Sequence, residues 1–237
     1  EKALAIKEKY PKIENVITDY KVALNDEEVD AVFVLTPNFA HYEITMDALK
    51  AGKHVLCEKP ITVNYALSVE MAEEAKKQGK ILDIGVCNRY NRSVEMLREW
   101  VEEGKFGEVY HVYASFRSCR SIPGLGGAFT NKAESGGGVL IDWGVHYLDI
   151  VMYCSGDPKP LTVSGEAFCK LGKDIENYTY ESMWSEMTRD VNGTYDVDDS
   201  VVGIIRTEGP TITLNGAWAQ NIGVSEMFID FLGTKAG

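Results

Sequence analysis

The chain has 237 residues, 45% of them hydrophobic and 25% charged, which is an ordinary composition for a globular protein of one large or two modest domains. Its formal net charge of -12 argues against general binding to nucleic acid or to an anionic membrane, because the long-range field repels phosphate. No uninterrupted apolar stretch is long enough to span a bilayer. We therefore expect neither nucleic acid nor a membrane among the partners.

The five cysteines are odd in number, lie far apart and form no Cys-x-x-Cys motif. This pattern indicates free thiols in a reducing compartment, so we expect a cytoplasmic protein without a disulfide framework or a zinc site. The carboxylates of Asp196, Asp198 and Asp199 lack a recognisable ligand spacing, and we interpret them as a solvated turn. No metal site is predicted.

The first third of the chain alternates strand and helix patterns. The chain opens on a short helical pattern that ends before Pro11. A helix is then expected to end near Lys50, with Gly52 as its C-cap, and another to run from an N-cap at Asn64 to Gly79. Continuous apolar runs predict strands buried on both faces of a parallel sheet. These runs are "AVFVL" (31–35), "HVLC" (54–57) and "ILDIGV" (81–86). Together they predict a parallel sheet with helices packed on it.

Polar segments follow each of these strands. They are Thr36-Pro37-Asn38, Glu58-Lys59-Pro60 and Asn88-Arg89. Because ligands of open parallel sheets bind at the carboxyl ends of the strands, we expect the three segments to line one crevice. Pro60 disfavours helical geometry at Lys59, so the lysine side chain can point into that crevice. A solvated Glu-Lys turn is the alternative interpretation.

The second part of the chain changes character near Tyr90. A helix ending near Gly104 is followed by strand patterns in "EVYHVYASF", "TVSGEAF", "DDSVVGIIRTEG" and "TITLNGAWAQN". The last two have no helix between them, which favours a mainly antiparallel sheet. We therefore divide the chain into a partial domain of parallel sheet at 1–90 and a partial α+β domain at 91–237.

One helix interrupts those strands, in "ESGGGVLIDWGVHYLDIVMYCSG". Its period predicts a buried stripe formed by Ile141, Val145, Leu148 and Met152. Asp142 and His146 are one turn apart on a neighbouring stripe, where they can meet at hydrogen-bonding range. A solvated polar face is the alternative to a catalytic pair.

These motifs, taken in order, resemble the Gfo/Idh/MocA oxidoreductases. The resemblance rests on Thr36-Pro37-Asn38-x-x-His41, on the run from Ala51 to Pro60, on Gly136-Gly137-Gly138-x-Leu140-x-Asp142-x-Gly144-x-His146, and on the ending Asp230-Phe231-Leu232-Gly233-Thr234-Lys235-x-Gly237. It covers essentially the whole chain. It implies a Rossmann-type α/β domain followed by an α+β domain with a mainly antiparallel open sheet, which in this family often joins subunits. We expect a homodimer or homotetramer formed through that sheet.

The resemblance also implies site residues and a cofactor, NAD or NADP. Lys59, Asp142 and His146 match the positions that surround the reacting hydroxyl. The residues expected to bind the cofactor are Thr36, Pro37, Asn38, His41, Glu58, Lys59 and Asn88. The glycine-rich turn that opens the family's Rossmann domain does not precede Glu1, and "PGLGGAF" does not replace it. We therefore expect an internal piece of a longer enzyme, truncated at both ends.

The chemistry of the three candidate catalytic residues fits alcohol oxidation. Histidine can accept a proton near neutral pH with little adjustment of its pKa. Lys59 as an ammonium can stabilise the developing alkoxide, whereas as a base it would need a pKa far below its usual ~10.4. We favour His146 as the base and Asp142 as its orienting group or as an acceptor for a substrate hydroxyl. Lys59 as the base is the alternative.

The expected substrate is a small polyhydroxylated molecule, namely a sugar, glycoside or cyclitol oxidised at a secondary alcohol. Tyr178, Tyr180 and Trp184 could pack on a sugar ring, although a surface or subunit-interface role fits them equally. Two other functions stay open. One is an NAD-dependent glycosidase that oxidises its sugar transiently, and the other is a non-catalytic nucleotide-binding sensor.

Overall fold

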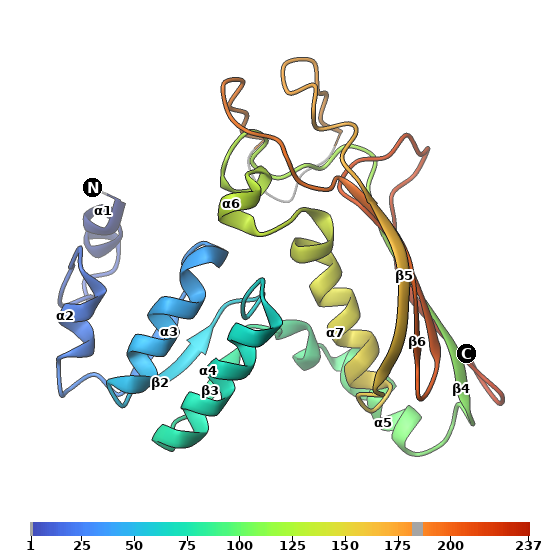
Figure 1. The fold of residues 1–237 in the computed structure, drawn as a ribbon, viewed down its shortest axis with the longest axis horizontal. Coiled ribbons are helices and arrows are strands. Elements are labelled where there is room, and N and C mark those ends of the chain that lie inside the picture. The colour runs from blue at the N-terminus through green and yellow to red at the C-terminus, as the bar shows by residue number, and fades with distance from the viewer. Residues whose placement is uncertain (1, 182–186) are drawn as a thin grey trace.

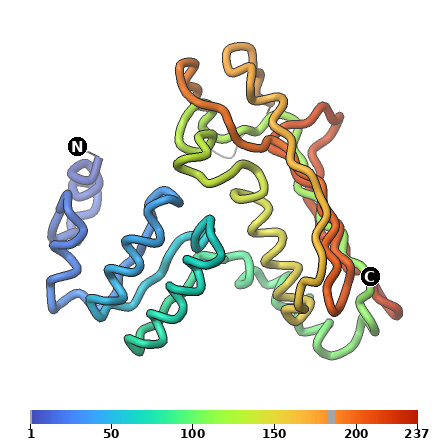
Figure 2. The backbone as a smooth tube through the Cα atoms, in the orientation of Figure 1, coloured from blue at the N-terminus to red at the C-terminus, as the bar shows by residue number. Residues whose placement is uncertain are grey.

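The computed structural model describes residues 2–181 and 187–237, so Trp184 lies outside the described residues. Within these ranges the chain forms a three-stranded sheet and a five-stranded sheet, each with helices packed on one face (Figure 1). The two termini lie at opposite sides of the molecule, and the chain passes once from the first sheet to the second (Figure 2). No helix in the described ranges is long and apolar enough to cross a membrane.

The first sheet has the order β1-β2-β3, and both pairings are parallel, as predicted. Its elements are α1 (Lys2–Lys9), α2 (Tyr20–Leu24), β1 (Ala31–Val34), η1 (Asn38–Ala40), α3 (His41–Lys50), β2 (His54–Cys57), α4 (Tyr65–Gln78), β3 (Leu82–Ile84) and η2 (Cys87–Tyr90). The ends of α4 follow the predicted chemistry. The Asn64 side chain accepts a hydrogen bond from Ala66 N, and Gly79 adopts φ +63° at the C-cap.

Only one face of the first sheet is covered by the described helices. Val34, Val55 and Cys57 pack there against α3 and α4 in one hydrophobic cluster. Phe33 points to the other face and is 65% exposed, as is Leu35 just beyond the strand. The prediction of strands buried on both faces is therefore wrong for β1 in this structure, because the described residues supply no layer against Phe33.

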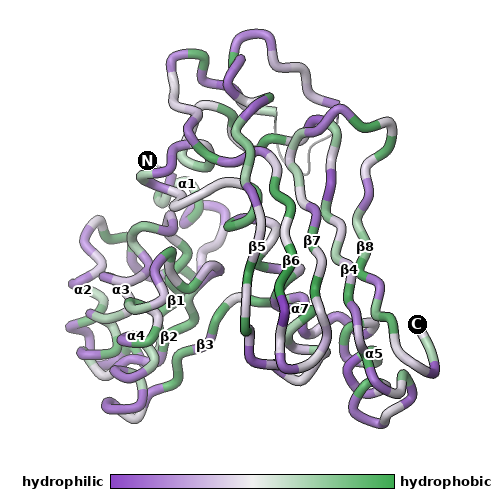
Figure 3. The backbone as a smooth tube through the Cα atoms, turned by 45° about the vertical axis from the view of Figure 1, so that its right-hand side comes forward, coloured by the Kyte–Doolittle hydropathy of each residue, from purple (hydrophilic) through white to green (hydrophobic). Residues whose placement is uncertain are grey.

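The second sheet has the order β5-β6-β7-β4-β8, which Figure 3 shows from its broad side. Its pairings are antiparallel except for β4 with β7, so the mainly antiparallel prediction is confirmed. The elements of this part are α5 (Arg92–Glu102), β4 (Val109–Arg117), η3 (Ala128–Thr130), α6 (Lys132–Ser135), η4 (Leu140–Gly144), α7 (Val145–Cys154), β5 (Pro160–Phe168), β6 (Ser200–Thr207), β7 (Thr211–Ala217) and β8 (Glu226–Gly233).

Helices α5 and α7 lie on one side of this sheet, the side that faces the first sheet (Figure 1). The core between them holds Val112, Phe116, Val151 and Cys154, each at most 1% exposed. The Phe116 ring lies 4.7 Å from that of Tyr147 on α7. No helix of the described chain lies against the other face of the sheet, which is open.

The start of α7 differs from its predicted helical phase. Residues Leu140–Gly144 form a π-helical turn, which takes more residues per turn than an α-helix and rotates the side chains that follow. The buried residues of this helix are Val151 and Cys154, together with Gly144 in the turn. Of the predicted stripe of Ile141, Val145, Leu148 and Met152, all four are partly buried, and only Leu148 and Met152 pack against the core.

Candidate active site

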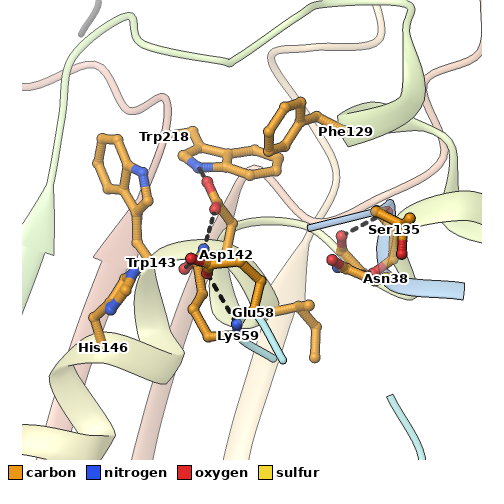
Figure 4. A pocket seen from close by; sticks show the side chains of 12 residues that line it. Asn38, Glu58, Lys59, Phe129, Ser135, Asp142, Trp143, His146 and Trp218 are labelled. Atoms are coloured by element: carbon orange, nitrogen blue, oxygen red, sulfur yellow. Dashed lines mark hydrogen bonds and ion pairs between the residues drawn. The ribbon is translucent and has the colours of Figure 1, made fainter. Parts of the chain in front are cut away.

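A cavity of about 620 Å³ lies between the carboxyl ends of β1 and β2 and the first turns of α7 (Figure 4). It receives side chains from both parts of the chain, which meet there across more than 80 positions of sequence. Its lining residues are Thr36, Asn38, Glu58, Lys59, Phe129, Ser135, Gly137, Ile141, Asp142, Trp143, His146 and Trp218. The structure thus brings Lys59, Asp142 and His146 together.

Lys59 is tied to the π-helical turn. Its Nζ donates to the Asp142 carboxylate oxygen Oδ1 at 2.8 Å and to the Asp142 carbonyl oxygen at 3.0 Å. The Lys59 and Asp142 side chains are 19% and 13% exposed, so this ion pair is largely shielded from water. The solvated-turn interpretation of Lys59 is therefore wrong. The Lys59–Pro60 peptide bond is cis.

The second oxygen of Asp142 is also occupied. Trp218, fully buried just after β7, donates its indole N–H to Asp142 Oδ2 at 3.2 Å. Among the described residues, the Asp142 carboxylate thus bonds Lys59 and Trp218 rather than His146. The expectation that Asp142 and His146 meet directly is not met, because the π-helical turn changes their angular separation.

His146 is the second basic group that lines the cavity. Its Nδ1 is buried and has no hydrogen-bond partner among the described residues. Burial lowers the pKa of His146 below its ordinary value, and the Lys59 charge lowers it further, while the Asp142 charge acts in the opposite direction. The imidazole is therefore neutral around pH 7, which is the state a proton acceptor needs.

Asp198 fixes the glycine segment that leads into α7. Its carboxylate accepts from the backbone N–H of Gly138 at 2.8 Å and of Leu140 at 3.1 Å. Its neighbour Asp199 is fully buried and accepts from three successive N–H groups, those of Lys170, Leu171 and Gly172. The prediction of a solvated turn is therefore wrong for Asp198 and Asp199, whose carboxylates accept hydrogen bonds from backbone amides, whereas Asp196 is exposed. The described residues hold no group of side chains with metal-binding geometry.

The loop after β1 supplies the other wall of the cavity. Asn38 donates its side-chain amide to the Ser135 carbonyl at 2.8 Å, which joins this loop to α6. Thr36 Oγ1 is buried and has no partner within the described ranges. The Glu58 carboxylate accepts from Lys59 N at 3.0 Å. Pro37 lines an adjoining hollow that shares Thr36 and Asn38 with the cavity.

Two predicted cofactor residues lie elsewhere. His41 is fully buried, and its ring nitrogens lie 2.8 Å from the carbonyl oxygens of Pro60 and Thr36. His41 therefore links the loop after β1 to the loop after β2 by hydrogen bonds, and this geometry does not support direct contact with a cofactor. Asn88 is not among the residues that line the cavity. Its neighbour Arg89 instead forms a two-pronged ion pair with Asp149 of α7.

Sequence reasoning missed the aromatic part of the cavity. Phe129, Trp143 and Trp218 all line it, from η3, the π-helical turn and the end of β7 (Figure 4). Trp143 sits inside the recognised helix motif and could have been noticed there. Phe129 and Trp218 have no local signal, because the segment between β4 and η4 brings Phe129 to the site and the end of β7 brings Trp218.

The residues present fit one part of a nicotinamide dinucleotide. Thr36, Pro37, Asn38 and Glu58 lie at the carboxyl ends of parallel strands, where such cofactors bind. The unpartnered Thr36 hydroxyl needs a hydrogen-bonding group from outside the described residues. These features define an α/β protein of the dinucleotide-binding class.

Comparison with known families identifies the class more closely. Residues 1–86 match "Oxidoreductase family, NAD-binding Rossmann fold", and residues 94–237 match "GFO/IDH/MocA C-terminal domain". The chain belongs to the Gfo/Idh/MocA family of oxidoreductases. The predicted family, fold class and class of cofactor are confirmed.

Several characterised relatives act on sugars or cyclitols by name. The chain is 38% identical over 238 residues to D-glucoside 3-dehydrogenase of Escherichia coli (strain K12), a match that covers 99% of this chain and 65% of the relative. It is 32% identical over 145 residues to myo-inositol 2-dehydrogenase of Thermotoga maritima, a match that covers 61% of this chain and 42% of the relative. An oxidoreductase domain protein of Kribbella flavida has a similar structure, with a TM-score of 0.80 and 26% sequence identity. The match covers 98% of this chain and 60% of that protein. The chain thus spans less than two thirds of the length of each.

Proposed function

We propose that this protein transfers a hydride between a secondary alcohol of a sugar or glycoside and a nicotinamide cofactor, NAD or NADP. The observation that carries the proposal is the single cavity in which Lys59, Asp142 and His146 meet below the carboxyl ends of β1 and β2. The three groups that alcohol oxidation requires of the protein are a proton acceptor, a charge that stabilises the alkoxide, and a fixed support for that charge.

In this proposal Thr36, Pro37, Asn38 and Glu58 hold the cofactor, whose nicotinamide ring supplies the hydride acceptor. His146 takes the hydroxyl proton from the substrate, because its lowered pKa leaves the imidazole neutral. Lys59 donates a hydrogen bond to the substrate oxygen and stabilises its developing negative charge. Asp142 holds the Lys59 side chain in place, and Trp218 in turn holds Asp142.

D-Glucosides are the substrates we propose first. The support is the 38% identity, over 99% of this chain, to a D-glucoside 3-dehydrogenase. The aromatic side chains of Phe129, Trp143 and Trp218 also suit a sugar, because pyranose rings have apolar faces that pack on aromatic rings. Free hexoses and inositols belong to the same chemical class and form the comparison set.

The complete enzyme should reduce NAD⁺ or NADP⁺ when mixed with one of these compounds, which absorbance of the reduced nicotinamide measures directly. Stoichiometric net reduction also separates the proposal from its alternatives. A glycosidase that oxidises its sugar only transiently yields cleaved glycoside without net reduction, and a sensor yields neither product. The absence of net reduction with every compound and both cofactors would overturn the proposal.

Three further features belong to this proposal. We assign residues 1–90 to the dinucleotide-binding domain and residues 91–237 to the substrate domain.

A cytoplasmic location is supported by the five cysteines, which are all free thiols. A homodimer or homotetramer is supported by the open face of the second sheet, where Val202 and Ile204 are 42% and 39% exposed.

A further inference from the structure

A second hollow, of about 380 Å³, adjoins the catalytic cavity and shares Phe129 with it. Its walls come from two segments far apart in sequence, 123–129 and 188–190. The Phe129 side chain is 43% exposed and lies at the edge of the catalytic cavity beside Trp218 (Figure 4). The second hollow therefore lies next to the catalytic cavity, with Phe129 in the walls of both.

Backbone hydrogen bonds hold the walls of this hollow in place. Asp190 N donates to the Leu125 carbonyl at 2.8 Å, which joins the two segments directly. Gly126 N donates to Thr130 Oγ1 at 2.9 Å, and the same hydroxyl donates to the Thr194 carbonyl at 2.8 Å. The hollow is thus formed before any ligand arrives, which reduces the entropic cost of binding.

The lining selects an uncharged group with an apolar face. Ala128 and Phe129, whose side chains are exposed, supply apolar surface. Arg189 also lines the hollow, and its guanidinium donates hydrogen bonds to the backbone carbonyls of Glu176 and Tyr178. Two nitrogens of the guanidinium are thus held by backbone carbonyls, and the negative charge of Asp190 in the same lining disfavours a phosphate.

We propose that this hollow, the outer subsite, binds the anomeric substituent of a glycoside whose sugar ring occupies the catalytic cavity. The favoured substituent is an uncharged ring, either an aryl group or a second sugar. This inference rests on the proposed function, because it assumes a sugar in the catalytic cavity. It narrows the substrate class from sugars and cyclitols in general to glycosides that carry a ring as their aglycone.

The test compares the binding of methyl β-D-glucoside and phenyl β-D-glucoside to the complete protein by isothermal titration calorimetry, so turnover is not needed. We expect the phenyl compound to bind about tenfold more tightly, the scale of a modest apolar contact in a pocket. Thr188→Trp fills the outer subsite from an exposed position and should remove this advantage. Thr18→Trp, at an exposed threonine before α2, is the matched control and should retain it.

Ala128→Trp fills the outer subsite from its other wall and gives the same answer if Thr188→Trp does not fold. Equal affinity of the wild-type protein for the two glucosides, binding of neither, or an advantage that survives a folded filling variant would overturn the inference. The two proposals fail separately. If the phenyl compound binds more tightly but no nicotinamide is reduced, the outer-subsite proposal holds and the proposed dehydrogenase activity fails. If nicotinamide is reduced but the two glucosides bind equally, only the outer-subsite proposal fails.

Discussion

At the scale of single residues, the pKa of His146 makes the first prediction. Burial and the Lys59 charge lower this pKa, so the neutral imidazole persists to lower pH than in a free histidine. The acid limb of the pH profile of kcat/KM should therefore lie below the ordinary value of ~6.5, with activity lost as pH falls through it. His146→Ala should abolish that limb and lower kcat by about 10²–10⁴-fold, measured by steady-state kinetics across pH.

Lys59→Met is the complementary variant. It should lower kcat, and the remaining acid limb should move to higher pH, because the variant removes a charge that lowers the His146 pKa and leaves the Asp142 charge that raises it. A limb that persists in His146→Ala and disappears in Lys59→Met would instead identify the lysine as the base.

Trp218 gives the second prediction. Trp218→Phe keeps an aromatic ring after β7 but removes the donor to Asp142 Oδ2. Because a hydrogen bond to a charged group contributes about 1.5–3 kcal/mol, we expect kcat to fall by about tenfold or more as Asp142 and Lys59 lose their fixed geometry. Trp143→Phe is the matched control, since its indole lines the same cavity without a hydrogen bond to a described residue. Equal kcat losses in the two variants would contradict a positioning role for Trp218.

At the scale of elements, the π-helical turn carries Asp142 and Trp143 into the cavity lining, and the Gly136–Gly138 segment comes just before that turn. Gly138 packs so closely on the Asp198 backbone that a Cβ there would overlap the Asp198 carbonyl oxygen. Gly138→Ala should therefore destabilise the fold by about 1–3 kcal/mol or more, measured by chemical denaturation. Gly223→Ala, where a Cβ meets nothing within 4 Å, should change stability little. Similar losses in both variants would show that the close approach is unimportant.

The same elements show how far sequence could predict this structure. The strand "HVLC", the Asn64 cap and the αL conformation of Gly79 were predictable because apolar runs and cap chemistry are local signals. The π-helical turn was not, because it depends on Asp198, 60 positions away, bonding the amide of Gly138. Trp218 reaches the site for a similar reason, through the pairing of β7 with β4. The candidate lysine, aspartate and histidine could be predicted because the sequence motifs that contain them can be recognised without knowledge of long-range contacts.

At the scale of the whole molecule, the cavity exists because contacts join the two sheets. Lys59 bonds Asp142, Asn38 bonds the Ser135 carbonyl, and Arg89 bonds Asp149 while its guanidinium lies 4.8 Å over the Tyr153 ring. All of these contacts run from the first part of the chain to α6, to the π-helical turn η4 or to α7. The loops after β1 and β2 are therefore bonded directly to the second part of the chain, and a shift of one part relative to the other would separate Lys59 from Asp142.

The open face of the second sheet leads to the last prediction, that this face joins subunits. Val202 pairs with Glu166 across the strands and lies on the open face, whereas Val163 pairs with Ile205 on the core side. Both valines are exposed, at 42% and 72%. Val202→Glu should shift the protein to smaller species in analytical ultracentrifugation, because a buried, unpaired carboxylate destabilises an interface. Val163→Glu makes the same substitution off that face and should leave the oligomer unchanged. A wild-type protein that sediments as a monomer, or equal effects of the two substitutions, would contradict assembly through this sheet.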